Sequence, residues 1–156
     1  MVIKDSVVAT EPRTGDADDI GRLRDVLGFH IRLAHGAVYR HFTESFADLA
    51  LTQKQVSVLW LVDDHPGIAQ AGIAARMRMD RATTMGIVNK LQARGLLVRR
   101  PSRSDGRMQA LDLTDEGRAM LQQAKSAVEE HEGWLRARFT PREAETLVKL
   151  LSRIYE

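Results

Sequence analysis

The stretch RRPSRSDGRMQALDLTDEG, residues 99–117, carries more positive charge than a purely structural hairpin needs. A Ser-Asp-Gly turn lies between Arg103 and Arg107, and Arg99 and Arg100 precede it. An arginine on a narrow turn can enter the minor groove of DNA, where the negative potential is strongest. Asp105 is close enough in the sequence to pair with Arg107 and hold its guanidinium in place. These residues therefore predict contacts with a polyanion.

Positive charge is concentrated in the segment that contains this stretch. Between Arg76 and Arg107, nine Lys or Arg stand against Asp80 and Asp105, a balance of +7. The whole chain of 156 residues has a net charge of only +2, so the remaining residues carry a balance of −5. Such a segregated basic segment is typical of nucleic-acid binding, and a basic surface that is merely solvated is the alternative.

Two short helices and a hairpin are predicted in the basic segment. Residues 68–79, IAQAGIAARMRM, predict the first helix, and residues 80–95 predict the second, with Asp80 as N-cap and Gly95 at the end. The brief turn between them indicates a helix-turn-helix. Strands at 96–100 and 108–114 then form a hairpin, which is a wing attached to the helix-turn-helix.

The second helix has the character of a recognition helix. Its periodicity predicts an inward face of Thr84, Ile87, Val88 and Leu91. The opposite face is small and polar near the N-terminus, as close approach to base edges requires. Gly86 lies on that face, and because a mid-helix glycine costs about 1 kcal/mol, it suggests that another surface approaches closely; a tolerated glycine is the alternative.

The candidate DNA contacts lie on this helix and on the wing. Arg81 can reach guanine, Thr83 can reach bases or phosphate, and Met85 can contact a thymine methyl. Lys90 and Arg94 are better placed for phosphates, as are Arg99 and Arg100. The predicted DNA-binding residues are Arg81, Thr83, Thr84, Met85, Gly86, Asn89, Lys90, Arg94, Arg100, Arg103, Asp105 and Arg107.

Longer helices must flank the winged helix-turn-helix, which is expected over residues 51–114. After a flexible arm at 1–16, apolar residues at steps of three and four predict one long helix within 17–49, part of which should pack on a partner chain. Residues 115–156 predict two further helices, the last opened by a capping box from Thr140 to Glu143. The predicted fold class is therefore mainly α with a small β-hairpin wing, with dimerisation helices at both ends.

Three stretches, LTQKQVSVLWLV, MDRATTMGIVNKLQARGLLVRR and SRSDGRMQALDLTDEGRAML, closely resemble the MarR family of bacterial transcriptional regulators. The resemblance covers about residues 20–156, and the wing from Asp105 to Gly117 is its most specific part. It implies a homodimer whose first and last two helices interleave. It also implies binding to double-stranded DNA at a palindromic operator, and release of the DNA when a small ligand binds.

The resemblance places an effector between the dimerisation helices and the winged helix. This region includes the first helix, the second helix, and the start of the helix that follows Thr114. Relatives often sense aromatic acids or their coenzyme A thioesters, and a pocket with imidazole or cationic donors and aromatic walls would suit such anions. The alternatives are that each histidine is internally satisfied or solvent-facing, and that Trp60 is a core residue. The candidate effector-binding residues are His30, His35, Tyr39, Arg40, His41 and Trp60.

Several other classes of function are disfavoured. The chain has no cysteine, which excludes disulfides, thiolate metal sites and thiol-based sensing. His35 and His41 are not spaced one helical turn apart, so no metal site is expected. No Gly-rich phosphate loop, nucleophile elbow or Ser-His-Asp set points to an enzyme or to a cofactor. Without a membrane-spanning run or a signal-peptide pattern, a cytoplasmic, nucleoid-associated location is expected.

The main hypothesis is therefore a ligand-responsive DNA-binding regulator, acting as a repressor. The alternative is a DNA-binding regulator or an architectural protein without a small-molecule ligand. The two differ in one observable, because only the first changes its DNA affinity when a ligand is added.

Overall fold

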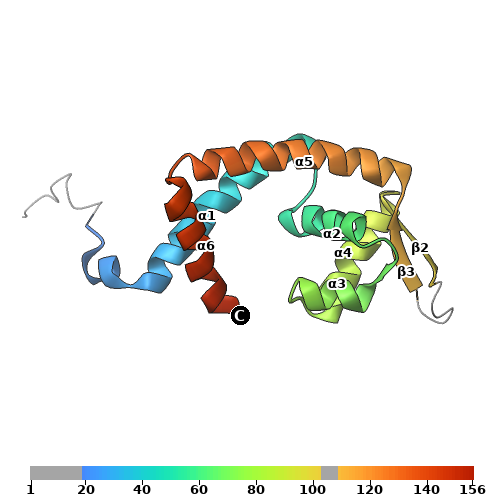
Figure 1. Ribbon diagram of the computed structural model, residues 1–156, viewed down its shortest axis with the longest axis horizontal. Coiled ribbons are helices and arrows are strands. Elements are labelled where there is room, and N and C mark those ends of the chain that lie inside the picture. Colours follow the sequence, from blue (N-terminus) through green and yellow to red (C-terminus); the bar gives the residue numbers. More distant parts are fainter. Residues whose placement is uncertain (1–18, 103–108) are drawn as a thin grey trace, which may run out of the picture. The chain divides into compact units, whose positions relative to one another are not determined.

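The computed structural model describes residues 19–102 and 109–156 (Figure 1). The chain divides into two compact units, Met1–Ala37 and Val38–Glu156. The described part is mainly helical with one small antiparallel sheet, as the sequence predicts. The predicted arm at 1–16 lies outside the described residues, and so does the tip of the wing.

The predicted long helix within 17–49 is wrong as a continuous element. The chain forms a 3-10 helix, Gly21–Asp25, then α1, Leu27–Ser45, and a second 3-10 helix, Ala47–Leu49. Val26 is extended between the first two, and Ala50 ends the third in the left-handed region at φ 48°. Apolar residues recur every three residues in a 3-10 helix as well, so the periodicity did not reveal the breaks.

The second helix begins and ends where its local signals predict. In α2, Gln53–Asp64, the Thr52 hydroxyl accepts from the Gln55 N–H while the Gln55 side chain accepts from the Thr52 N–H. This reciprocal pair satisfies two amides that a helix start otherwise leaves unpaired. The helix ends before His65, and Gly67 follows in the left-handed region at φ 80°.

The helix-turn-helix is formed by α3, Gln70–Arg76, and α4, Arg81–Ala93. Asp80 caps α4 as predicted, because its carboxylate accepts from the Thr83 N–H. The predicted first helix starts two residues too early, however. Ile68–Ala69 is a short strand, β1, which pairs with β3 instead of continuing the helix.

The wing strands are β2, Leu97–Pro101, and β3, Gln109–Leu113. The sheet has the order β1-β3-β2 and is antiparallel, with Leu97 opposite Leu113 and Arg100 opposite Ala110. The Gly67 N–H donates to the Leu111 carbonyl and to the Asp112 carboxylate, which holds β1 beside β3. Ala110, Leu111 and Leu113 of β3 are buried.

Two helices complete the second unit: α5, Asp115–Arg136, and α6, Pro141–Tyr155. Thr114 caps α5, and a Cβ atom at Gly117 would lie 2.0 Å from the Leu96 carbonyl oxygen, so only glycine fits in this first turn. Thr140 and Glu143 form the predicted capping box of α6. The hydrogen bonds from the Thr140 backbone and hydroxyl hold the pKa of Glu143 below its usual value.

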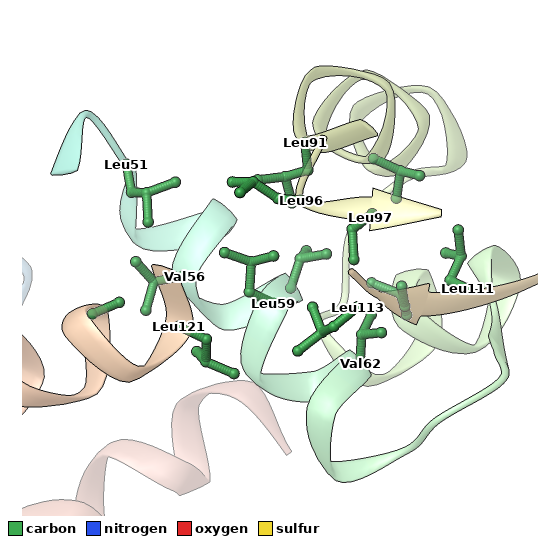
Figure 2. Packing of buried hydrophobic residues seen from close by; sticks show 14 of the residues in the cluster. Leu51, Val56, Leu59, Val62, Leu91, Leu96, Leu97, Leu111, Leu113 and Leu121 are labelled. Atoms are coloured by element: carbon green, nitrogen blue, oxygen red, sulfur yellow. The ribbon is translucent and has the colours of Figure 1, made fainter. Parts of the chain in front are cut away.

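The hydrophobic core lies among α2, α4, the wing strands and the first half of α5 (Figure 2). Its most deeply buried members include Leu59, Leu91, Leu111 and Leu121, one from each of these elements. One face of α4 therefore packs in the core against the sheet, and the opposite face of α4 is left to solvent. Among the described residues, no helix is long and apolar enough to cross a membrane.

Candidate functional site

The start of α4 is held by a tight side-chain cap. The Asp80 carboxylate accepts from the Thr83 N–H at 2.7 Å and from the Thr83 hydroxyl at 2.6 Å. These hydrogen bonds, the one from the side chain first, hold the pKa of Asp80 below its usual value. The hydroxyl of Thr83 is therefore committed to the cap as a donor, and only its lone pairs and methyl group are left for another partner.

The predicted contact face of α4 is largely accessible. Arg81, Met85, Gly86, Asn89 and Lys90 are all exposed, and Met85 has an exposed fraction of 50%. A Cβ atom added at Gly86 would meet no atom within 4 Å. Nothing within the described part of the chain therefore requires glycine there, which strengthens the interpretation that an outside surface comes close.

Thr84 does not belong to this face. Its side chain is fully buried, and its hydroxyl donates to the Asp80 carbonyl at 2.9 Å. Its place in the predicted DNA-binding set is wrong, whereas its place on the inward face is confirmed. The physical reason is geometric, because Thr84 lies four residues after the cap residue Asp80, on the same side of α4 as the buried Val88 and Leu91.

Two arginines predicted to contact phosphates have internal partners instead. The Arg94 guanidinium donates to the carbonyls of Ala50, at 2.7 Å, and Leu49, at 3.1 Å. It therefore anchors the turn that precedes α2. The Arg99 guanidinium donates to side-chain amide oxygens on α3 and α4. Both residues take part in the framework of the site, and the phosphate contact predicted for each stays a prediction.

On the wing, the structure describes only one residue of the predicted set. Arg100 is exposed on β2, opposite Ala110 of β3. Arg103, Asp105 and Arg107 lie outside the described residues. The predicted pairing of Asp105 with Arg107 therefore stays a prediction.

A pocket of about 450 Å³ lies between α2 and the second half of α5, beside the end of α1. Trp60, Phe42 and Leu135 give it apolar walls, and Gln53, Ser57, His131 and Glu132 supply polar groups. The sequence placed the effector near the start of α5, but the lining residues of α5 run from Val128 to Leu135. The residues at the start of α5 are used instead for the core, through Leu121, and for the close approach at Gly117.

His131 is one of the pocket-lining residues that were not predicted from the sequence. It is buried, and its Nδ1 lies 2.8 Å from the Nδ1 of His41 on α1. The His41 ring stacks on Trp134 with 3.9 Å between ring centroids. Burial first, and then the charge of His41, lower the pKa of His131, against the opposing effect of Glu132. Its spacing after Leu121, Ala124 and Val128 puts it on the apolar stripe of α5, and that signal was available.

The predicted effector residues are only partly brought together. Trp60 lines the pocket, and His41 reaches it through His131. Tyr39 and Arg40 are exposed on α1 and are not among the pocket's lining residues. His30 and His35 belong to the other unit, where the His30 Nε2 lies 2.7 Å from the Arg24 carbonyl. Within the described part of the chain, no three metal-binding side chains are grouped.

Comparison with known proteins also indicates a transcriptional regulator. The sequence profile of the MarR family matches residues 49–108. A protein of Thauera aromatica, named as a transcriptional regulatory protein for the hcr operon, is 30% identical over 148 residues, which are 93% of this chain and 89% of that protein. The matched relatives are regulators and not enzymes.

Solved structures of the repressor CouR share the fold. CouR bound to a 23-mer DNA duplex has a TM-score of 0.81 and 34% identity, covering 94% of this chain and 100% of that one. CouR bound to p-coumaroyl-CoA has a TM-score of 0.80 and 34% identity, covering 89% and 98%.

Proposed function

The chain belongs to the MarR family of transcriptional regulators, and from that premise we propose that it is a repressor that binds a palindromic operator as a homodimer and is released by a small effector. The observation that carries this proposal is the exposed face of α4. It is small and polar at its N-terminus, is held rigidly by the Asp80 cap and the core, and lies in the segment with a charge balance of +7. The DNA complex of CouR supports the same use of this fold.

We propose that Arg81, Met85 and Asn89 face the bases in the major groove, while Lys90 and Arg100 meet phosphates. The reason is position, since residues near the start of a recognition helix enter deepest. Gly86 allows the backbone of α4 to come close. Arg103 and Arg107 would extend the contact to the minor groove, with Asp105 holding Arg107.

The dimer would form through residues 17–49 and 115–156. On α6, Val148, Leu150 and Ile154 have exposed fractions of 59%, 49% and 63%, although they are large and apolar. Such a face needs a covering surface. A second copy of the chain provides one and also presents two copies of α4 to a palindrome.

The effector would be an aromatic acid or its coenzyme A thioester, bound in the pocket beside Trp60 and His131. The pocket offers one indole wall, further apolar side chains and the side-chain amide of Gln53 as a neutral donor. A flat aromatic group with an acyl function matches this combination. The complex of CouR with p-coumaroyl-CoA supports the thioester form. A regulator in which the pocket serves no ligand is the alternative.

The test is fluorescence anisotropy of the purified protein on the intergenic DNA upstream of its own gene, with and without aromatic acids and their thioesters. We expect tight, salt-dependent binding that one compound abolishes. Binding that no compound changes would favour the regulator without a ligand. Absence of specific binding to this DNA would refute autoregulation and require selection of the operator from random sequences.

A variant of the wing tests the DNA-binding mode. We expect Arg107→Ala to weaken binding strongly while the dimer persists, because a minor-groove guanidinium is lost. Removal of one cationic contact should also reduce the salt dependence of binding by about one charge. Unchanged affinity of Arg107→Ala would remove the wing tip from the proposed interface.

A further inference from the structure

Arg99 occupies the junction of the wing and the recognition helix. It lies on β2, is half-buried, and directs its guanidinium at the side chains of two helices. Nη2 donates to the Asn89 Oδ1 at 2.7 Å and to the Gln70 Oε1 at 3.4 Å, and Nη1 donates to the Gln92 Oε1. Asn89 and Gln92 come from α4, and Gln70 is the first residue of α3.

This arrangement fixes which end of each amide is available. A guanidinium has only donors, so it can be satisfied only by the oxygen of an amide and never by the nitrogen. It also stays charged at all ordinary pH values, so the preference does not change with pH. The NH₂ group of Asn89 is therefore the end that remains for an outside partner, and Asn89 is exposed on α4.

We propose that Arg99 is a positioning residue that sets the sequence preference of the recognition helix by holding Asn89 as a hydrogen-bond donor. A free asparagine reads adenine with both ends of its amide, accepting from N6 and donating to N7. In Asn89 the Arg99 guanidinium occupies one lone pair of the oxygen and fixes that end of the amide, so a contact with both ends to adenine would require the oxygen to accept a second hydrogen bond, whereas the NH₂ donors have no such requirement. Asn89 should therefore favour a base with acceptors alone on its major-groove edge, which is guanine with O6 and N7, over adenine.

The role rests on the proposed function, because it presumes that α4 enters the major groove. It differs from the phosphate contact expected for Arg99 on sequence grounds. A guanidinium has five N–H donors, and Arg99 uses three of them on amide oxygens from α3 and α4, so at most two remain for a phosphate. If Arg99 turned its whole guanidinium to a phosphate, it would also release Asn89.

The experiment is selection of DNA from a randomised duplex library, followed by sequencing, with the full chain and its variants. The decisive variant is Arg99→Lys, which keeps the charge but has no fork to bridge several amide oxygens. At the base pair that depends on Asn89, we expect the preference for guanine over adenine to fall about fivefold or more, with little change elsewhere in the site. Asn89→Ala identifies that base pair, because its preference should disappear.

Controls separate a positioning role from a general electrostatic one. In the Asn89→Ala background, Arg99→Lys should cause no further change in base preference. Lys54→Met, which removes an exposed positive charge at the start of α2, outside the dimer segments and the predicted DNA-binding residues, should leave the preference unchanged. Thermal melts of each variant would show whether it folds. If Arg99→Lys does not fold, Asn89→Ala still tests the role of the Asn89 donor directly.

The outcomes distinguish this inference from the proposed function. A wild-type protein that selects no sequence would refute the proposed function and the role of Arg99 together. A wild-type protein that selects a site, with an unchanged profile for Arg99→Lys, would overturn the positioning role alone. Arg99→Met with a uniform loss on all sequences and a lower salt dependence, rescued by Arg99→Lys, would show that Arg99 is a phosphate contact.

Discussion

At the scale of single residues, the site depends on which polar groups are already engaged. Thr83 and Arg99 both lie beside the exposed face of α4, yet each spends its donors on a neighbour in the chain. Arg81 and Lys90 are exposed, and the proposed function assigns them contacts with DNA. The residues proposed to touch DNA and the residues that orient them can therefore be separated by mutation.

Thr83 tests how much of the sequence preference depends on the cap of α4. We expect Thr83→Ala to alter base preference more than affinity for nonspecific DNA, because the hydroxyl that orients Asp80 and the start of α4 is lost. Thr83→Ser keeps the hydroxyl and should behave like the wild type. Anisotropy titrations on specific and random duplexes measure both quantities, and an equal loss on the two would contradict a role in base recognition.

His131 predicts a pH dependence of folding stability. Its pKa is lowered in the folded protein, so between that value and the unfolded value of about 6.5 the unfolded chain binds more protons. Its contribution to the free energy of unfolding is therefore present above about pH 6.5 and is lost as pH falls through the folded pKa, with a slope of at most about 1.4 kcal/mol per pH unit.

The measurement is urea unfolding of the wild type and of His131→Phe between pH 5 and 8 (roughly the range in which histidine titrates). We expect the variant to lose part of the acid-induced destabilisation. His65→Gln is the matched control, because His65 is an exposed histidine at the end of α2. Identical pH profiles for His131→Phe and the wild type would show that His131 is not the group responsible.

At the scale of elements, α4 combines a rigid inner face with an unusually bare outer one. The inner face is fixed by Thr84, Val88 and Leu91 in the core. The outer face contains Gly86, whose lack of a side chain has no explanation in the described contacts. A helix optimised for stability alone would carry alanine at this position.

Gly86→Ala separates the folding role of this position from its binding role. We expect the free protein to gain up to about 1 kcal/mol of stability, because alanine is the better helix former. We expect DNA binding to weaken, because the new methyl group holds α4 away from the groove. Gly133→Ala on α5 is the control for helix stabilisation, since a Cβ atom there also meets no atom within 4 Å. Tight DNA binding by Gly86→Ala would mean that nothing approaches there.

At the scale of the whole molecule, each of the two units leaves apolar side chains uncovered. Leu27 in the first unit has an exposed fraction of 72%, and Ile154 on α6 has one of 63%. Both belong to the segments assigned to the dimer. The winged helix-turn-helix, by contrast, has a closed core, which it shares with the first half of α5 (Figure 2) and with Phe42 and Phe46.

Removal of α6 should abolish the dimer. We expect a chain ending before Thr140 to sediment as a monomer and to lose affinity for a palindromic duplex. The double substitution Leu150→Glu with Ile154→Glu keeps the helix and should have the same effect, because both side chains are exposed in the single chain. Lys149→Glu is the charge control on the same helix. Analytical ultracentrifugation gives the answer, and a stable dimer without α6 would refute this assignment.

The sequence by itself determined the features that are encoded locally. Asp80 and Thr140 each cap the helix that they were predicted to cap, and the wing strands lie within one residue of their predicted starts. These signals act over three or four residues, so they can be read without knowing the rest of the fold. The same holds for the concentration of positive charge and for the resemblance to the MarR family.

Only the tertiary structure decided which side chains meet across the chain. Arg94 reaches the turn before α2, Arg99 holds Asn89, and His41 meets His131, although 90 positions separate the two histidines. Strand β1 likewise exists because β3 pairs with it. The sequence around a charged residue is the same whether its side chain is free or hydrogen-bonded within the protein, because packing sets its partners. That is why the sequence could predict a basic surface but not which of its arginines are spent on the framework.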